Sequence, residues 1–289
     1  MKTLHVDTGR EMHGGQWQVI YLTERLRDAV LLAPEDSILF LEARKRGLDV
    51  RPLSFKALVA LARAFDLVHA HDARAHTMAA AIPGIRLIVS RRVGFPVKRG
   101  VLSRLKYSRA RLFLAVSQFV AGRLQEAGVP ADRIRVVYDG VPLVEPAHGD
   151  NIVALVSKRS DLIRASAEAS RIPIRFVTDL WQDLATARVF LYASEMEGLG
   201  SAALAAMSAG VAVIASRVGG LPEAVEQERT GLLVANHPRE FAAALQRLVS
   251  APELAAQMGR LGRQRVETKF TADIMTERTR AAYHEVLGC

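Results

Sequence analysis

The sequence has little that would support disulfide chemistry or a large aromatic core. Its one cysteine, Cys289, is the last of 289 residues, which excludes an internal disulfide framework, a cysteine-based zinc site and a buried cysteine nucleophile. Aromatic residues make up only 6% of the chain. Half of the residues are hydrophobic and 24% are charged, a balance that excludes wholesale disorder and supports a folded core.

Long uncharged runs are also scarce. The stretch 198–216 has no charged residue and approaches the length of a bilayer span. It is rich in alanine, serine and glycine, and Gly210 interrupts it, so we expect a helix, a glycine stop and a buried strand instead. The first residues lead straight into a strand-like run, so we expect no secretory leader and a cytoplasmic chain.

Acidic residues are absent from one strongly basic segment. Residues 86–111 carry nine Lys and Arg side chains and no Asp or Glu. Residues 1–150 hold 23 basic and 15 acidic residues, a net charge of +8, whereas 151–289 hold 16 and 15. Such a cluster is typical of a surface that binds anions, and phosphate groups, an anionic membrane and nucleic acid are the candidates.

Short apolar runs alternate with helical patterns along most of the chain. This alternation is typical of βαβ units, in which helices cover both faces of a parallel sheet. The pattern breaks near 140–151, which contains Pro142, Pro146 and Gly149, and then restarts. We therefore expect an α/β fold with two Rossmann-like, doubly wound domains facing a cleft. They span 1–145 and 146–270, and a last helix within 271–289 packs back on the first domain.

Two strand ends in the first domain carry residues suited to ligands. Gly14 and Gly15 follow the first strand and open a helix, where backbone amides and the helix dipole favour anions. The alternative is an ordinary tight turn. His69 and His71 end a later strand, and we expect them to point to opposite faces of the sheet. A metal site would require a third ligand that the sequence does not demand.

Two further strand ends lie in the second domain. The run 194–201 places two acids before glycines at a helix start, where a carboxylate accepts hydrogen bonds from sugar or ribose hydroxyls and exposed amides suit phosphate oxygens. The run 217–223 repeats the pattern with Gly219, Gly220, Pro222 and Glu223. Each run alone is compatible with a solvated helix start, but their repetition favours a phosphate-bearing ligand.

These runs together resemble a known family. Residues 194–200, 206–216, 218–223 and 230–234 are similar to the C-terminal domain of the retaining glycosyltransferases of family 4, also called group 1, which have the GT-B fold. Weaker similarity extends over Gly14–Gly15, His69–His71, 115–117 and 137–141. The segment between Ser170 and Asp179 is short for the family, so the resemblance implies a shortened C-terminal domain.

The resemblance implies transfer of a sugar from a nucleotide diphosphate sugar to a glycan or lipid-linked acceptor, with retention at the anomeric carbon. Glu197, His71 and Lys158 match the family's catalytic positions. The resemblance assigns donor binding to the following residues: Gly14, Gly15, Arg159, Gly198, Leu199, Gly200, Ser201 and Glu223. It implies no metal and no cofactor, because amides, a helix N-terminus and cations neutralise the leaving diphosphate.

One motif position departs from the family. The family has a second acid eight residues after the first, where it contacts the ribose, and this chain has Ala205 there. A non-catalytic relative that binds a nucleotide sugar or a partner protein therefore remains an alternative. A sugar-nucleotide epimerase of the same fold is another.

The basic segment belongs to the domain that would hold the acceptor. We expect an anionic acceptor, or the inner face of the cytoplasmic membrane during surface polysaccharide or lipopolysaccharide synthesis in a bacterium. No nucleic-acid-binding module is recognisable, so we expect no nucleic acid partner. A solvated surface is the alternative. The residues expected to form the patch are Arg91, Arg92, Lys98, Arg99, Arg104 and Lys106.

Overall fold

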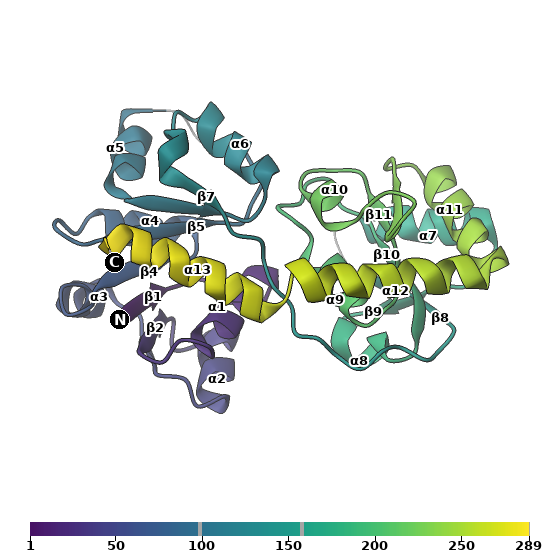
Figure 1. Cartoon of the computed structure of the whole chain (residues 1–289), viewed down its shortest axis with the longest axis horizontal. Helices are drawn as coiled ribbons and strands as arrows, with labels where there is room; N and C mark the ends of the chain where they lie inside the picture. The colour runs from purple at the N-terminus through teal and green to yellow at the C-terminus, as the bar shows by residue number, and fades with distance from the viewer. Residues whose placement is uncertain (98–99, 157–158, 289) are drawn as a thin grey trace. The chain divides into compact units, whose positions relative to one another are not determined.

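The structure is a computed structural model that describes residues 1–97, 100–156 and 159–288. The chain divides into two compact units. The first contains residues 1–139 together with 272–289, and the second contains residues 140–271. The end of the chain thus returns to the unit in which the chain begins (Figure 1).

The first unit is built on a seven-stranded parallel sheet with the order β3-β2-β1-β4-β5-β6-β7. Its strands are β1 (Thr3–Val6), β2 (Ala29–Ala33), β3 (Val50–Pro52), β4 (Leu67–Ala70), β5 (Leu87–Arg91), β6 (Leu112–Ala115) and β7 (Ile134–Val136). Its helices are α1 (Gly14–Thr23), α2 (Ile38–Lys45), α3 (Phe55–Ala62), α4 (Ala73–Ala80), α5 (Val101–Arg109), α6 (Gln118–Glu126), the 3-10 turn η1 (Ala131–Arg133) and α13 (Ala272–Leu287).

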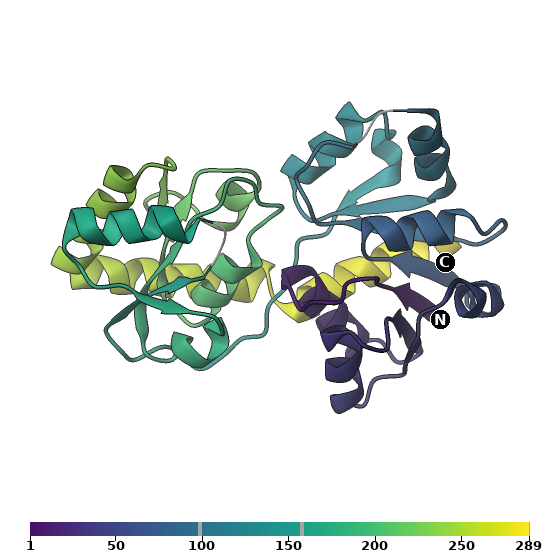
Figure 2. The same ribbon diagram turned by 180° about the vertical axis from the view of Figure 1, so that it is seen from behind.

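Helix α13 closes the core of the first unit. Its apolar residues recur every three or four positions, so one stripe of the helix, including Met275 and Tyr283, faces the core. This stripe shares one buried cluster with residues of α1 and α2 and with strand residues such as Leu31 and Leu112. Figure 2, seen from behind, shows α4 in front of the sheet and α13 beyond it. The two helices therefore cover opposite faces of the sheet.

The second unit has a smaller parallel sheet. Within its described residues the sheet has five strands in the order β12-β11-β10-β8-β9. They are β8 (Asn151–Leu155), β9 (Arg175–Val177), β10 (Ala187–Tyr192), β11 (Ala212–Ser216) and β12 (Gly231–Val234). The helices are α7 (Ser160–Ser170), α8 (Leu180–Leu184), α9 (Ser201–Ser208), α10 (Leu221–Ala224), α11 (Pro238–Ser250) and α12 (Pro252–Lys269).

The uncharged stretch 198–216 forms the predicted helix, glycine stop and buried strand. Helix α9 ends before Gly210, whose φ of +72° lies in the left-handed region, and β11 follows with all five residues buried. In the described part of the chain, no helix is both long and apolar enough to cross a membrane. The interpretation of this stretch as a bilayer span is therefore excluded.

Both sheets contain a point at which the strand order reverses. In the first sheet it lies between β1 and β4, and in the second between β8 and β10. Ligands of doubly wound folds bind at the carboxyl ends of the strands beside such a point, because the flanking connections there pass to opposite faces of the sheet and leave a crevice. The loops that follow β1, β4, β8 and β10 are therefore the natural places for a site.

Candidate functional site

In the second unit, the loop after β10 holds a partly buried carboxylate. The hydroxyl of Tyr192, the last residue of β10, donates a 2.6 Å hydrogen bond to Oε1 of Glu197. Burial raises the pKa of Glu197, whereas hydrogen bonds from Tyr192 and Ser194 lower it. Burial and the neighbouring carboxylate raise the pKa of Tyr192, so its hydroxyl remains a donor. The predicted residue Glu197 is thus fixed at the carboxyl edge of the sheet.

Glycines hold this loop against the next one. The amide of Gly220 donates to the carbonyl oxygen of Glu197 at 3.1 Å. Gly219 has a φ of +56°, and a Cβ there would lie 2.1 Å from the same carbonyl oxygen. Gly200 precedes α9 with a φ of +101°, and its own Cβ would meet Leu221 at 2.5 Å. The loops after β10 and β11 therefore approach more closely than other residues would allow.

The start of α9 has the features of an anion site. Gly200 caps the helix without a side-chain hydrogen bond, so the helix start has no side-chain acceptor at this cap. Ser201, the first residue of α9, is partly exposed. Gly198 and Leu199 are buried, so Leu199 contributes packing by its side chain and only its backbone is suited to a ligand. The structure thus places these predicted residues together at one helix start.

The loop after β8 brings a cation to the same edge. Arg159 lies 3.3 Å from Glu195, which follows β10, and 3.5 Å from Asp161. Because β8 and β10 flank the reversal point, the topology itself joins these two loops. The predicted catalytic Lys158 lies outside the described residues.

Two other positions of the motif have structural roles. Ala205 lies inside α9 and is only 4% exposed. Glu223 lies in α10, and its carbonyl oxygen accepts a hydrogen bond from Arg265 Nη2 at 2.8 Å. The main chain at Glu223 is therefore anchored to α12, while its side chain stays partly exposed.

In the first unit, the loop after β1 surrounds a buried acid. Asp7 accepts hydrogen bonds from the amide of Gly9 at 2.8 Å and from Gln16 Nε2 at 3.2 Å. Burial and the nearby Asp72 raise the pKa of Asp7, while those hydrogen bonds and Arg92 lower it. Asp7 was not among the predicted site residues, although an acid directly after a buried strand is a signal that identifies it.

Helix α1 begins beside this acid at Gly14 and Gly15. The amide of His13 donates to Gln16 Oε1 at 3.2 Å, which fixes the helix start. A Cβ on Gly15 would lie 3.9 Å from Cδ of Arg92, so the arginine passes close to the glycine pair. The predicted glycines and a cation therefore share this edge of the first sheet.

Arg92, which was predicted to lie in the basic patch, is largely buried. Its side chain is only 14% exposed, and its Nε donates to Oδ1 of Asp139, itself 11% exposed, at 3.1 Å. Burial requires that a charge be paired, and Asp139 supplies the partner. Arg92 is consequently part of the carboxyl edge near Gly15 and not of a solvated surface.

His71 belongs to a hydrogen-bonded chain with a fixed direction. Nη1 of Arg92 lies 3.2 Å from Nδ1 of His71, and Nε2 of His71 lies 2.9 Å from Nδ1 of His5. Because guanidinium only donates, Nδ1 of His71 must accept, so Nε2 carries the proton and donates to His5. His5 in turn donates from Nε2 to the Thr3 hydroxyl, 3.0 Å away. Burial lowers the pKa of both histidines, to about 3 for His5, which keeps them neutral.

His69 lies against the same chain. Side chains two residues apart on a strand point to the same face, so the expectation of opposite faces was wrong. The rings of His69, in β4, and His71, just after it, lie 4.0 Å apart. His69 Nδ1 lies 2.6 Å from the Tyr283 hydroxyl, and its Nε2 lies 2.8 Å from Ser90 Oγ.

The three histidines also have the spacing of metal ligands. The candidate ligand atoms of His5, His69 and His71 all lie within 4.8 Å of one another. Their six ring nitrogens nevertheless all have hydrogen-bond partners, and the charge of Arg92 opposes a cation beside His71. The geometry therefore favours a hydrogen-bonded chain over a metal centre.

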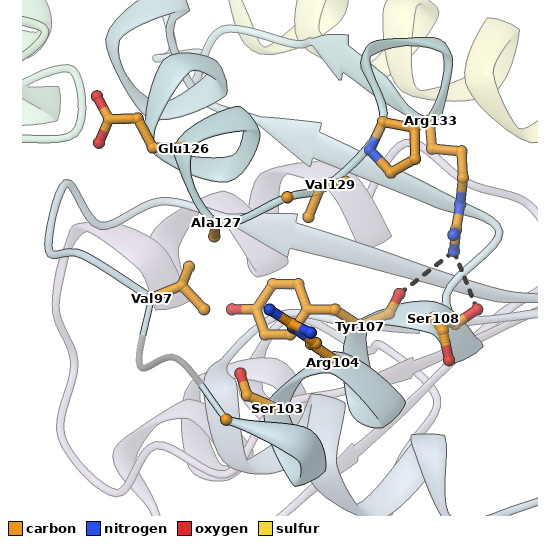
Figure 3. Close-up of a pocket in the computed structure, with 12 residues that line it drawn as sticks. Val97, Ser103, Arg104, Tyr107, Ser108, Glu126, Ala127, Val129 and Arg133 are labelled. Atoms are coloured by element: carbon orange, nitrogen blue, oxygen red, sulfur yellow. Dashed lines mark hydrogen bonds between the residues drawn. The ribbon is translucent and has the colours of Figure 1, made fainter.

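The remaining residues of the predicted patch are dispersed. Arg91 donates to the carbonyl oxygen of Phe95 at 2.7 Å, and Lys106 donates to that of Ala73 at 2.7 Å. Burial and Arg91 lower the pKa of Lys106. Arg104 is exposed and lines a cavity of about 530 Å³ beside α5, together with Val97 and Tyr107 (Figure 3). Lys98 and Arg99 lie outside the described residues.

Helix α5 exposes an apolar surface next to these cations. Val101, Leu102 and Leu105 are 82%, 83% and 57% exposed, and Phe95 in the preceding loop is 61% exposed. Among its described residues, α5 buries none. Exposed apolar residues gathered in this way mark interaction surfaces, because water contact with them is unfavourable.

Two families of known sequences match overlapping parts of the chain. The family described as Glycosyltransferase Family 4 matches residues 6–145, and the one described as Glycosyl transferases group 1 matches residues 116–251. Solved structures with the same fold include Anabaena HepE in complex with UDP-glucose. It has 17% sequence identity and a TM-score of 0.86, covering 99% of this chain and 100% of that one. A glycosyltransferase from Rickettsia africae has a TM-score of 0.80 and 17% identity, covering 99% of this chain and 98% of that one.

The two sheets and their connections thus define a GT-B fold. The chain thus carries a Glycosyltransferase Family 4 domain and a group 1 glycosyl transferase domain, as its motifs predicted.

Curated relatives align over parts of their length. D-inositol 3-phosphate glycosyltransferase of Streptomyces avermitilis is 32% identical over 194 residues, which cover 58% of this chain and 42% of that protein. Alpha-maltose-1-phosphate synthase of Mycolicibacterium smegmatis is 40% identical over 110 residues, 36% of this chain and 28% of that protein. The chain thus spans less than half the length of these relatives.

Proposed function

We propose that this protein transfers a sugar from a nucleoside diphosphate sugar to an acceptor, with retention at the anomeric carbon and without a metal. The observation that carries the proposal is the second unit's carboxyl edge. There Glu197, held by Tyr192, lies in a loop that leads into the glycine-capped start of α9. A carboxylate suits sugar hydroxyls and a helix start suits a phosphate.

The chemistry requires positive charge where the nucleoside diphosphate departs. As the glycosidic bond breaks, negative charge grows on the leaving diphosphate, and fixed donors that face it lower the barrier. Arg159 and the amides at the start of α9 are suited to this task in the second unit, and Lys158 is proposed beside them. Gly14 and Gly15, at the start of α1, remain proposed donor-binding residues, because a helix start suits phosphate oxygens.

His71 is proposed to position a cation, because its ring nitrogens are both engaged. It accepts from Arg92 and donates to His5, which leaves the ring neutral and fixed. Arg92 is in this way held beside Gly15, where an anionic substrate group would meet it. Two of the relatives described above are named after phosphorylated compounds, maltose 1-phosphate and inositol 3-phosphate. These names support an anionic acceptor for this protein.

Part of the proposal concerns the membrane. The exposed apolar residues of α5 lie on a helix that also carries Arg104 and Lys106, a combination typical of helices that lie in a membrane interface. We propose peripheral contact with an anionic bilayer, where a lipid-linked acceptor for surface polysaccharide or lipopolysaccharide synthesis would be presented. Loss of vesicle binding in Leu102→Asp, with glycosyl transfer to a water-soluble acceptor retained, is the expected result.

A non-catalytic nucleotide-sugar binder is the second candidate, and Ala205 is the observation that favours it. A buried methyl group replaces the acid that contacts the ribose in the family, and each lost hydrogen bond costs about 0.5–1.5 kcal/mol. An epimerase of the same fold would form product without an acceptor.

A thermal-shift series with UDP-, GDP- and ADP-sugars, followed by a mass-tagged transfer assay with and without acceptor and with EDTA, tests these candidates. The proposal requires a stabilising donor and acceptor-dependent turnover that EDTA leaves intact. Stabilisation without any turnover would contradict transfer and support the non-catalytic candidate.

A further inference from the structure

The acid-free segment 86–111 separates into two places in the first unit. Arg91 and Arg92 lie at the carboxyl end of β5, beside the candidate site. Arg86 directly precedes β5, Arg109 ends α5, and Arg111 directly precedes β6. Since β5 and β6 are parallel neighbours, these last three arginines lie at the amino edge of the same sheet, opposite the candidate site.

A depression of about 760 Å³ lies at this amino edge. Arg86, Arg109, Arg111 and Arg133 all line it, together with the C-terminal turn of α4. The side chains of Arg86, Arg109 and Arg111 are exposed. Within the described residues, none of these three forms an ion pair with a carboxylate. Four guanidinium groups thus surround one depression without a balancing acid.

The fold accounts for only part of this charge. Nη2 of Arg133 donates to the carbonyl oxygens of Tyr107 at 3.3 Å and Ser108 at 3.1 Å, so it satisfies the C-terminal end of α5 (Figure 3). Arg109, in the last turn of α5, also complements the helix dipole. Arg86 and Arg111 precede strands and have no comparable role, so their charges are left to solvent or to a ligand.

We propose that this depression is a phosphate-binding site, separate from the proposed glycosyl-transfer site and on the opposite edge of the sheet. Guanidinium is the side chain best matched to phosphate oxygens, because its planar fork donates two parallel hydrogen bonds. Like charges gathered without an acid repel one another, and a bound anion removes that repulsion. The phosphate belongs either to a lipid headgroup or to a small water-soluble phosphate compound.

The experiment compares two double variants of the full chain. R86Q/R111Q removes the two arginines that lack a role in helix α5. R239Q/R260Q is the matched control, because it removes two exposed arginines of the second unit and changes the net charge equally. The water-soluble probes are inorganic phosphate and glycerol 3-phosphate, measured by calorimetric titration. The lipid probe is a vesicle of phosphatidylcholine and phosphatidylglycerol in equal parts, measured by sedimentation.

We expect R86Q/R111Q to lower the affinity for the probe that the wild type binds by about 25-fold, because each arginine near an anionic surface contributes about fivefold. The control should stay within about twofold of the wild type. Binding of the water-soluble probes would identify a free phosphate compound, and binding of vesicles alone would identify a headgroup. No binding of any probe, or equal weakening in both variants, would overturn the proposal. If the wild type binds phosphate at this depression but transfers no sugar, only the proposed function is contradicted.

Discussion

At the scale of single residues, the site depends on carboxylates and cations that are buried together with a partner. The protonation of Glu197 is a balance between burial, which favours the neutral acid, and the hydroxyl of Tyr192, which favours the carboxylate. Arg92 and Asp139 make a similar pair in the first unit. In both places removal of one partner leaves the other in an unfavourable state.

The first prediction concerns Tyr192→Phe. Removal of the hydroxyl takes away a hydrogen bond that lowers the pKa of Glu197, so this pKa rises further and less carboxylate is present at a given pH. The acid limb of the kcat/KM profile should therefore move to higher pH. The control Tyr107→Phe, far along the sequence in α5, should leave the limb in place. An unchanged limb in Tyr192→Phe would show that Glu197 does not control it.

The second prediction is a double-mutant cycle on Arg92 and Asp139. Arg92→Gln removes the guanidinium that pairs with the largely buried carboxylate of Asp139, so it should lower the free energy of unfolding by about 3 kcal/mol. The combined R92Q/D139N variant should regain at least half of that loss. Urea unfolding measures both values, and strictly additive losses would show that the pair does not interact.

Single residues of the site were only partly predictable from the sequence. Glu197 follows a strand and precedes glycines, so local sequence identifies it. The pairing of Arg92 with Asp139 joins residues 47 positions apart, and the approach of Arg92 to Gly15 brings together the ends of two strands of the same sheet. Such contacts depend on tertiary packing, so the sequence alone did not reveal that Arg92 is largely buried and paired with Asp139.

At the scale of elements, the glycine-rich loops act as a unit. The carbonyl of Glu197 receives the Gly220 amide, and Gly219 leaves the space for this approach. The loop that carries the carboxylate is thus positioned by the loop after the neighbouring strand β11.

The third prediction tests this arrangement with Gly219→Ala. The added Cβ would lie 2.1 Å from the Glu197 carbonyl oxygen, in addition to the cost of the left-handed backbone. Gly47→Ala is the control, because Gly47 has a φ of +73° and open space around it, so only the backbone cost of about 1 kcal/mol applies.

We expect Gly219→Ala to lose at least about 2 kcal/mol more stability than Gly47→Ala in urea unfolding. It should also lower donor affinity in a thermal-shift titration, whereas Gly47→Ala should not. Equal effects of the two variants would show that the contact between the loops is dispensable.

Elements were more predictable than contacts. The helix, Gly210 and strand β11 follow from composition and a single glycine, because these signals are local. The sequence pattern also predicted a last helix within 271–289, and α13 (Ala272–Leu287) is that helix. The sheet order, which creates the two reversal points, depends on long-range pairing and follows from the family resemblance rather than from periodicity.

At the scale of the whole molecule, the first unit is made from both ends of the chain. Helix α13 supplies buried residues to its core, and the Tyr283 hydroxyl bonds His69 on the central strand β4. The fold of this unit and its histidine chain are therefore linked to residues more than 200 positions away.

The fourth prediction is that Tyr283→Phe destabilises the first unit. The variant leaves Nδ1 of His69 buried without its partner, which costs about 1–3 kcal/mol. Tyr21→Phe is the control, since Tyr21 is also buried and its hydroxyl has no hydrogen bond within the described residues. Thermal unfolding should show a loss for Tyr283→Phe and a change within about 0.5 kcal/mol for Tyr21→Phe. Equal losses of stability in the two variants would show that the hydrogen bond between Tyr283 and His69 does not stabilise the first unit.

The main inference about this protein is that the carboxyl edge around Glu197 serves glycosyl transfer. Its most direct test is the rate of mass-tagged sugar transfer by the wild type and by Glu197→Gln, with circular dichroism to verify that both are folded. We expect acceptor-dependent transfer by the wild type and a loss of about 100-fold or more in the variant. Full activity in a folded Glu197→Gln, or no transfer by the wild type from any nucleotide sugar that binds, would contradict it.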